Sequence, residues 1–439
     1  MSRFLAFLFI FFSLLAVTPE VKGATLTLEE AVERALNESV NLRKSAIDLA
    51  QAEYSARRLW SEIFPGINLS AGFTFLPSTP LATNGGFSYD SDALSYNLSL
   101  GLSLSLNPSL ASSMKRIELA YRSQLLSYEN ACRQLEIQVI KNFLNLITMK
   151  ENLAFLAERL ELAENKLAND RVARQNGLLS ELAWLNSQLS AETARYNLIQ
   201  AEGTYQNSLE EFLASIGMEA DADITLTGTI DLVQVQSDPE QLILEFLPKR
   251  PDIVNQRQTI ERLELGKNQT ALASRFPTLN LSTQWRGGNE TGGGLSSPFT
   301  DSVSGSITLN VPIDSWIPGT RQSQTIRAAN SEVEKARLDL QDMESSGRTQ
   351  IRSLVSNLRK TWESLSVARM RVDIAQRTVE ATGISFRNGI VEFQELEDRR
   401  NDLSDARQRL LQEELSYKSL LLDLSSALNV EWKTLIRNL

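Results

Sequence analysis

Residues 64–70 read FPGINLS, and residues 276–282 read FPTLNLS. Asn176-Gly177 likewise returns as Asn388-Gly389, and both matches lie 212 positions apart (65 to 277, and 177 to 389). A constant offset over so long a span indicates that one structural unit was duplicated. Each copy combines short segments of alternating polarity with long tracts that contain no proline.

The alternating segments predict four β-strands, two in each copy. The clearest is LSYNLSLGLSLSLN (94–107), which places apolar side chains on one face and small polar side chains on the other. The four strands are predicted at about 66–76, 93–107, 278–286 and 302–313. Each is long enough to supply the 9–11 residues with which a tilted strand crosses a bilayer. A soluble sheet with one solvated face is the alternative.

The proline-free tracts predict two long helical hairpins, over 110–216 and 320–429. From Tyr121 to Leu167, mostly apolar residues recur with alternating spacings of four and three, a repeat typical of coiled-coil packing. Asn-Gly ends the first helix of each hairpin, where glycine supplies the left-handed cap. Shorter helices are expected at about 28–36, 39–63, 239–247 and 251–275.

The chain boundaries follow from these patterns. Residues 1–23 resemble a signal peptide, with Arg3 before an apolar run and a small-residue cleavage site. The first structural repeat then covers 24–217, a linker covers 218–238, and the second repeat covers 239–439. The mature chain is therefore expected to be exported from the cytoplasm.

Composition excludes several classes of protein. The 439 residues carry 44 Lys and Arg against 54 Asp and Glu, so the net charge of −10 argues against nucleic-acid binding. The sequence has no histidine and one cysteine, which removes the commonest general base and metal ligand and any internal disulfide. No phosphate-binding motif is present. We therefore expect no enzyme activity, no cofactor and no metal.

Four strands cannot close a barrel by themselves. In lipid, an open sheet edge leaves backbone N–H and C=O groups unpaired at a cost of several kcal/mol each. Sharing one barrel among identical chains removes the edges: two copies give eight strands, three give twelve and four give sixteen, and the larger two leave a lumen. The sequence thus predicts a membrane pore joined to a helical pipe.

Three motifs resemble the outer membrane efflux protein family, the TolC-like exit ducts. Residues 26–37 (LTLEEAVERALN) are similar to the family's opening helix, Arg250-Pro251-Asp252-Ile253 to the start of its second half, and 177–180 (GLLS) to its hairpin tip. The resemblance covers essentially the whole mature chain. It implies a mainly α protein with membrane β-strands, a homotrimer that shares a 12-stranded β-barrel on a 12-helix periplasmic coiled-coil tunnel.

The resemblance also implies a function and partners. The chain is expected in the outer membrane, extending into the periplasm, as the passive exit duct of a tripartite efflux or type I secretion system. Its partners would be outer-membrane lipid, a periplasmic adaptor (membrane fusion) protein, and an inner-membrane transporter of the proton-driven RND or ATP-driven ABC type. The alternative is a secreted or periplasmic coiled-coil scaffold without a pore.

The hairpin tips are candidate contact sites for the adaptor, because apolar side chains at exposed turns favour a partner surface. A hydrophobic clasp that closes each turn is the alternative. The residues concerned are Gly177, Leu178 and Leu179 in the first tip and Gly389, Ile390 and Val391 in the second.

An acidic helical face follows the second tip. Glu395, Asp398 and Asp402 are spaced by three and four residues, so they share one face and would form rings of carboxylates in an oligomer that attract cations. The resemblance implies that Glu395 and Asp398 narrow the tunnel entrance, with Phe386 at an aromatic latch position where it lacks a hydroxyl. The alternatives are a solvated charged face or an enzyme site built on Glu395 and Asp398.

Overall fold

The structure is a computed structural model that describes residues 24–75, 81–83, 86–88, 94–219, 224–228, 232–236, 238–289, 298–431 and 433. The chain divides into two compact units. Unit 1 comprises residues 1–43, 130–247 and 348–439, and unit 2 comprises residues 44–129 and 248–347. Each unit takes segments from both sequence repeats. The predicted signal peptide and parts of the predicted linker lie outside the described residues.

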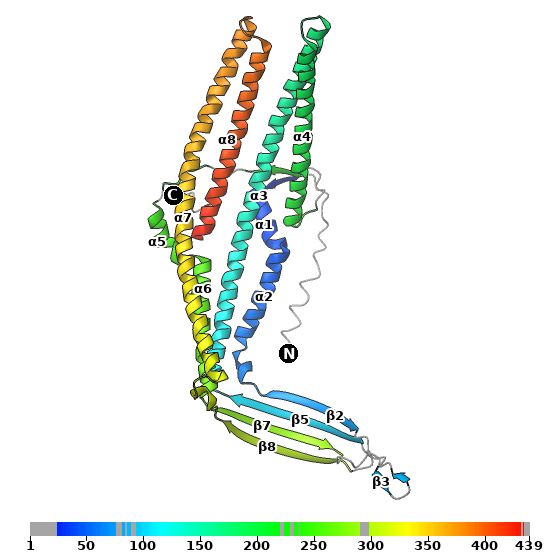
Figure 1. The fold of residues 1–439 in the computed structure, drawn as a ribbon, viewed down its shortest axis with the longest axis vertical. Helices are drawn as coiled ribbons and strands as arrows, with labels where there is room; N and C mark the ends of the chain where they lie inside the picture. The colour runs from blue at the N-terminus through cyan, green and yellow to red at the C-terminus, as the bar shows by residue number, and fades with distance from the viewer. Residues whose placement is uncertain are drawn as a thin grey trace, which may run out of the picture. The chain divides into compact units, whose positions relative to one another are not determined.

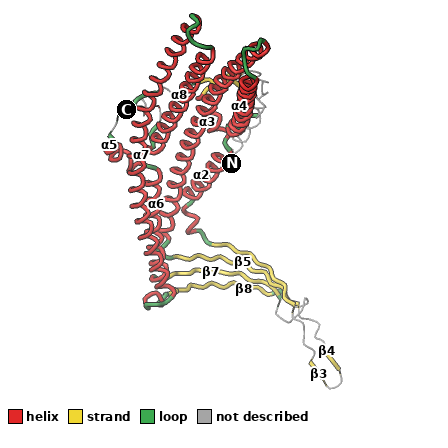
Figure 2. Tube along the Cα trace, turned by 45° about the horizontal axis from the view of Figure 1, so that its top comes forward, coloured by secondary structure: helices red, strands yellow, loops and turns green. Residues whose placement is uncertain are grey.

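Four long helices account for nearly half of the chain (Figures 1 and 2). They are α3 (Leu110–Gln175), α4 (Glu181–Ser215), α7 (Arg321–Arg387) and α8 (Phe393–Leu428). α3 contains neither proline nor glycine, so nothing interrupts its backbone hydrogen bonds over 66 residues. The predicted helical hairpins are therefore present.

The shorter helices precede the strands and hairpins. They are α1 (Leu28–Glu38), α2 (Val40–Arg57), α5 (Pro239–Phe246) and α6 (Pro251–Arg275). Three 3₁₀ turns accompany them: η1 (Leu59–Ile63) follows α2, η2 (Leu247–Lys249) joins α5 to α6, and η3 (Asp314–Trp316) precedes α7. Thr27 and Glu30 form a reciprocal capping box at the start of α1. The helix predicted at 39–63 is α2 followed by the separate turn η1.

Unit 1 contains a small parallel sheet that the sequence patterns do not predict. β1 (Ala24–Thr27) pairs with β6 (Ile224–Thr227), which comes from the predicted linker. Leu26 and Leu226 on these strands are buried in a core that includes Phe143 of α3 and Phe212 of α4. The two phenyl rings meet edge to face with centroids 6.2 Å apart.

Tyr417 of α8 binds a second described part of the linker, residues 232–236, in unit 1. Its hydroxyl donates to the Val233 carbonyl at 2.6 Å and accepts from the Val235 N–H at 3.2 Å. The ring is fully buried and contacts Trp362 of α7, with centroids 5.3 Å apart. Burial raises the pKa of the Tyr417 hydroxyl, so the neutral form that makes both hydrogen bonds is favoured.

Unit 2 contains a four-stranded antiparallel sheet in the order β2-β5-β7-β8 (Figure 1). The strands are β2 (Gly66–Phe75), β5 (Leu94–Leu106), β7 (Thr278–Gly288) and β8 (Thr300–Asn310); a separate hairpin joins β3 (Leu81–Thr83) to β4 (Gly86–Ser88). β8 ends before the predicted residue 313, and Pro312, which lacks an N–H, lies just beyond its end. β5 joins the two repeats by pairing with β7.

The register of the sheet aligns the apolar residues of all four strands on one face. Leu69, Leu100, Trp285 and Val303 lie opposite one another across the sheet, and Leu104, Leu281 and Ile307 form another row. Several of these side chains are exposed in the single chain, including Leu69, Leu100 and Ile307. The sheet therefore presents a broad uncovered apolar face.

Among the described residues, no helix combines the length and apolar character that a membrane span requires.

Candidate functional site

The two hairpin tips have the same backbone geometry. Gly177 has φ +72° and Gly389 has φ +69°, both in the left-handed region that favours glycine. In each tip the glycine N–H and the next N–H reach back to carbonyls of the last helical turn: Gly177 to Arg174 and Leu178 to Ala173, each at 2.9 Å. The second tip repeats both hydrogen bonds: the Gly389 N–H donates to the Phe386 carbonyl and the Ile390 N–H to the Ser385 carbonyl, each at 2.9 Å. These paired bonds end α3 and α7.

The first tip exposes Leu178 and secures the start of α4. The Leu178 side chain is 81% exposed, whereas Leu179 is half-buried. Ser180 caps α4 by accepting the Ala183 N–H at 3.2 Å. Arg174 of α3 pairs with Glu181 at 2.7 Å, and its guanidinium lies 4.0 Å from the centre of the Trp184 ring. These contacts stabilise the turn without Leu178, so its side chain stays exposed to solvent.

The second tip exposes Ile390 in the same way. Ile390 is 73% exposed and Val391 is half-buried. Here an aromatic pair fastens the turn, because the rings of Phe386 and Phe393 lie 5.7 Å apart. The predicted latch residue Phe386 therefore contacts the first residue of α8 within the chain.

The three predicted acidic residues beyond the second tip are all exposed, and an arginine lies between two of them. Arg399 pairs with Glu395 at 3.3 Å and with Asp402 at 3.1 Å. The hydrogen bond that Arg399 donates to Glu395, followed by the one that it donates to Asp402, raises the pKa of Arg399. Asp398 accepts a hydrogen bond from Gln394 at 2.8 Å. Three carboxylates and one guanidinium leave this face with a net charge of −2 per chain.

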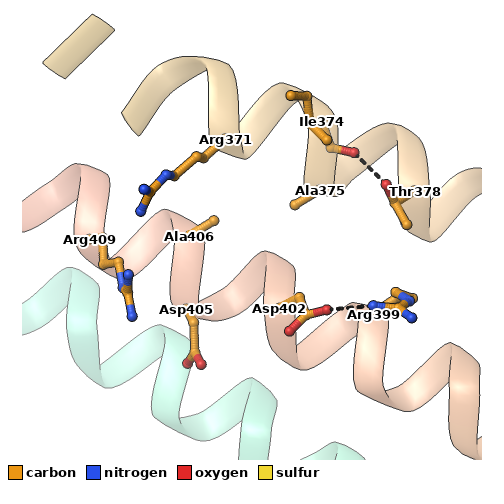
Figure 3. A pocket seen from close by; sticks show the side chains of 9 residues that line it. All are labelled: Arg371, Ile374, Ala375, Thr378, Arg399, Asp402, Asp405, Ala406 and Arg409. Atoms are coloured by element: carbon orange, nitrogen blue, oxygen red, sulfur yellow. Dashed lines mark hydrogen bonds and ion pairs between the residues drawn. The ribbon is translucent and has the colours of Figure 1, made fainter. Parts of the chain in front are cut away.

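The α7–α8 groove continues from this face (Figure 3). It has a volume of about 400 Å³ and is lined by Arg371 and Ile374 of α7 and by Arg399, Asp402, Asp405 and Arg409 of α8, among others. Three arginines and two aspartates make the charged part of its lining net positive. The acidic character is therefore confined to the residues next to the tip.

Glu397 is a charged residue that the sequence patterns did not single out. It points away from the acidic face and is only 4% exposed, with Arg400 at 3.2 Å. Burial raises the pKa of the Glu397 carboxyl, and Arg400 and Lys166 of α3 partly offset that rise. Lys166 also binds Gln394 of α8, so this part of α8 faces α3.

Polar contacts establish the order of the long helices within unit 1. Arg195 of α4 pairs with Glu164 of α3 at 2.7 Å, and Lys141 of α3 pairs with Asp423 of α8 at 2.5 Å. Arg407 of α8 donates to Gln376 of α7 at 3.0 Å. The order is therefore α4-α3-α8-α7, which leaves α4 and α7 on the flanks.

Comparison with known proteins agrees with this architecture. A sequence profile described as outer membrane efflux protein matches residues 31–218 and 242–430, one match for each repeat. None of the curated proteins compared with the chain matches it significantly. Because the profile covers most of the chain, the protein belongs to the outer membrane efflux protein family.

Solved structures share the fold at low sequence identity. The CmeC outer membrane channel of Campylobacter jejuni superposes with a TM-score of 0.73 at 16% identity, covering 93% of this chain and 88% of that one. A membrane protein from Pseudomonas aeruginosa gives 0.71 at 18% identity, covering 91% and 92%. The open state of the MtrE outer membrane channel of Neisseria gonorrhoeae gives 0.68 at 15% identity, covering 92% and 89%.

Family membership confirms the predicted class. The protein is an outer-membrane exit duct that extends into the periplasm, and it is a transport conduit and not an enzyme. The described residues contain no cluster of His, Cys, Asp and Glu suited to a metal ion. The predicted roles of the tip residues and of the acidic face remain predictions.

Proposed function

We propose that the protein works as a homotrimer in which three four-stranded sheets close into one twelve-stranded barrel in the outer membrane. The observation that carries this proposal is the sheet itself. It has one apolar face, and β2 and β8 at its ends each pair with a single described strand. In lipid such free edges need partners, and another copy supplies them.

The flanking helices of unit 1 support the same assembly. α4 exposes Leu182, Leu185, Leu189, Tyr196 and Ile199, and α7 exposes Val367, Met370, Ile374 and Ile384. Both sets follow heptad spacing, which is the pattern of a coiled-coil seam. We propose that α7 of one copy packs on α4 of the next and so closes a twelve-helix tunnel.

The hairpin tips are proposed to dock onto a periplasmic adaptor protein, which an inner-membrane transporter feeds. Leu178 and Ile390 support this role, because both are largely exposed apolar side chains on turns that are already closed by backbone hydrogen bonds. Leu179 and Val391 are half-buried beside them, so they fit the alternative of a clasp better. Docking would then depend on one side chain at each tip.

The acidic face is proposed to select cations at the tunnel entrance. Glu395, Asp398 and Asp402 are exposed, and a ring of three copies would concentrate cations. Arg399 weakens that field by pairing with two of the three carboxylates. We therefore expect a moderate cation preference, with Asp398 as its main source.

Two substitutions on neighbouring residues of β8 test the barrel. Ile307 lies on the apolar face and is 78% exposed in the single chain, whereas Thr308 lies on the opposite face. An arginine on the lipid face near the bilayer centre costs about 2–4 kcal/mol. Ile307→Arg should therefore abolish outer-membrane assembly, and Thr308→Arg should preserve it.

The readouts are fractionation with outer membrane and the yield of trimers that resist dissociation in detergent. A scaffold without a pore would tolerate both substitutions equally, because arginine at an exposed position costs a water-soluble sheet almost nothing. Equal assembly of both variants would therefore contradict the proposal.

A further inference from the structure

The polar face of the sheet is almost free of charge. Apart from one arginine, its residues in the described strands are Ser, Asn, Thr, Gln and Gly, in rows such as Asn68, Gly101, Gln284 and Ser304. Hydroxyl pairs such as Ser70–Ser99 and Ser282–Ser306, each at 2.7 Å, join neighbouring strands on this face. If the apolar face meets lipid, the polar face lines the water-filled interior of the barrel.

Only two of the residues in the four described strands are charged, and they lie on opposite faces. Asp301 of β8 lies in register with Gly287 on the apolar face and accepts the Trp285 indole N–H at 3.2 Å. Arg286 of β7 lies on the polar face, in register with Ser99 on one side and Ser302 on the other. Arg286 is therefore the single charge on the polar face of these strands.

The Arg286 guanidinium is available for a ligand. It is exposed, and its hydrogen bond is to Gln284, whose Oε1 accepts from Nη2 at 3.3 Å. No carboxylate pairs with it in the part of the chain that the structure describes. A guanidinium has five N–H donors, so most of them face the space next to the polar face.

We infer that Arg286 is a specificity-determining residue of the duct, where three copies form a cationic ring that favours anionic solutes. The inference rests on the proposed trimeric barrel, which turns one arginine per chain into a ring. β7 begins just after α6, so Arg286 lies near the strand end that is distant from that helix. Rings of arginine select for anions, and among the described strand residues that share the polar face with Arg286 none carries a compensating charge.

The test is the reversal potential of single channels in a planar bilayer under a KCl gradient. Arg286→Gln should raise the K⁺/Cl⁻ permeability ratio about twofold, a modest change because charges are screened over about 10 Å at 0.1 M salt. Arg286→Glu should raise it further, and Arg286→Lys should keep the wild-type ratio. Asp301→Asn is the matched control, since it removes the other strand charge from the opposite face, and should leave the ratio unchanged.

A second measurement needs only the wild-type protein and one variant. Inorganic tripolyphosphate should reduce the wild-type current in a concentration-dependent way, and Arg286→Gln channels should resist it. Channels whose permeability ratio is the same in wild type, Arg286→Gln and Arg286→Glu, and which tripolyphosphate does not block, would overturn the inference and leave the barrel intact. Wild-type protein that fails to insert into the bilayer at all would overturn the barrel as well.

Discussion

The first and second hairpin tips are two copies of one turn that now present different chemistry. Both end a long helix with Asn-Gly in the same conformation, and both expose one large aliphatic residue, Leu178 or Ile390. They diverge on the helix that follows. α4 continues with exposed leucines, whereas α8 continues with three carboxylates and Arg399.

This difference shows how duplication can separate two tasks. The backbone of the turn depends on glycine and a few hydrogen bonds, so it survives almost any change on the exposed helix faces. Those faces are then free to specialise, with an apolar seam suited to a neighbouring helix on α4 and a charged surface suited to ions on α8. Substitutions at the two tips separate the features that they share from those that they do not.

The shared apolar tip should produce the largest effect. Leu178→Asp and Ile390→Asp each place a charge on a surface proposed to meet the adaptor. The double variant should co-purify with the adaptor protein of the same host at least tenfold less. A tenfold loss corresponds to about 1.4 kcal/mol of binding free energy. Leu244→Asp is the control, because Leu244 is 80% exposed on α5, away from the tips. An equal loss with Leu244→Asp would show that the tips have no special role.

The shared glycines should have equal effects on stability. Nothing lies within 4 Å of a Cβ built on Gly177 or Gly389, so alanine there costs only the left-handed backbone, about 1–2 kcal/mol. Hydrogen exchange at residues 170–176 and 382–388 should accelerate for the respective variants. Gly203→Ala in α4 also meets open space but has a helical backbone, so it should leave exchange unchanged or slower. A difference between the two tips would contradict their equivalence.

The charged face of the second tip should respond to Arg399. Arg399→Gln frees Glu395 and Asp402 from their partner, so the K⁺/Cl⁻ permeability ratio should rise about twofold in a planar bilayer, within the limits that screening sets. Asp398→Asn should lower the ratio. Ser187 occupies the position in the first repeat that corresponds to Arg399, and Ser187→Ala should leave the permeability ratio unchanged. If both the Arg399 and the Asp398 variants had the wild-type permeability ratio, the proposed role of this face in ion selectivity would be wrong, while the fold would be unaffected.

Glu397 should give the smallest effect, and its sign is fixed by the direction of its pKa shift. Because burial raises the pKa of Glu397 in the folded protein, the folded state holds this proton more tightly than the unfolded state. Stability from this group is therefore present below the ordinary Glu pKa of about 4.3 and is lost as pH rises through the folded value.

Replacing the ionisable group tests that sign. Glu397→Gln should raise Tm at pH 7 by about 1–2 °C, which corresponds to a fraction of a kcal/mol, and should have no effect at pH 4. Glu392→Gln, at the exposed N-cap of α8, is the comparison variant and should not stabilise at pH 7. A lower Tm for Glu397→Gln at pH 7 would mean that the ion pair with Arg400 outweighs the cost of burial.

Much of the candidate site was visible in the sequence. Asn-Gly after a long apolar repeat predicted both turns, and the three-and-four spacing placed Glu395, Asp398 and Asp402 together. The position of Arg399, four residues after Glu395 and three before Asp402, was also readable as a pair of helix-face contacts. The burial of Glu397 could not be predicted from the sequence, because it depends on where α3 lies relative to α8. No local pattern contains that information.

The sequence by itself determined the fold class, because repeat length, strand alternation and heptad spacing are local consequences of the helix and strand periods. It also separated the apolar from the polar strand residues. Only the tertiary structure decided that β6, from the linker, pairs with β1, that Tyr417 binds the chain at Val233 and Val235, and that Arg286 lies in register with Ser99 and Ser302. These features arise from contacts between residues far apart in the chain, where register and packing, and not local preference, determine the neighbours.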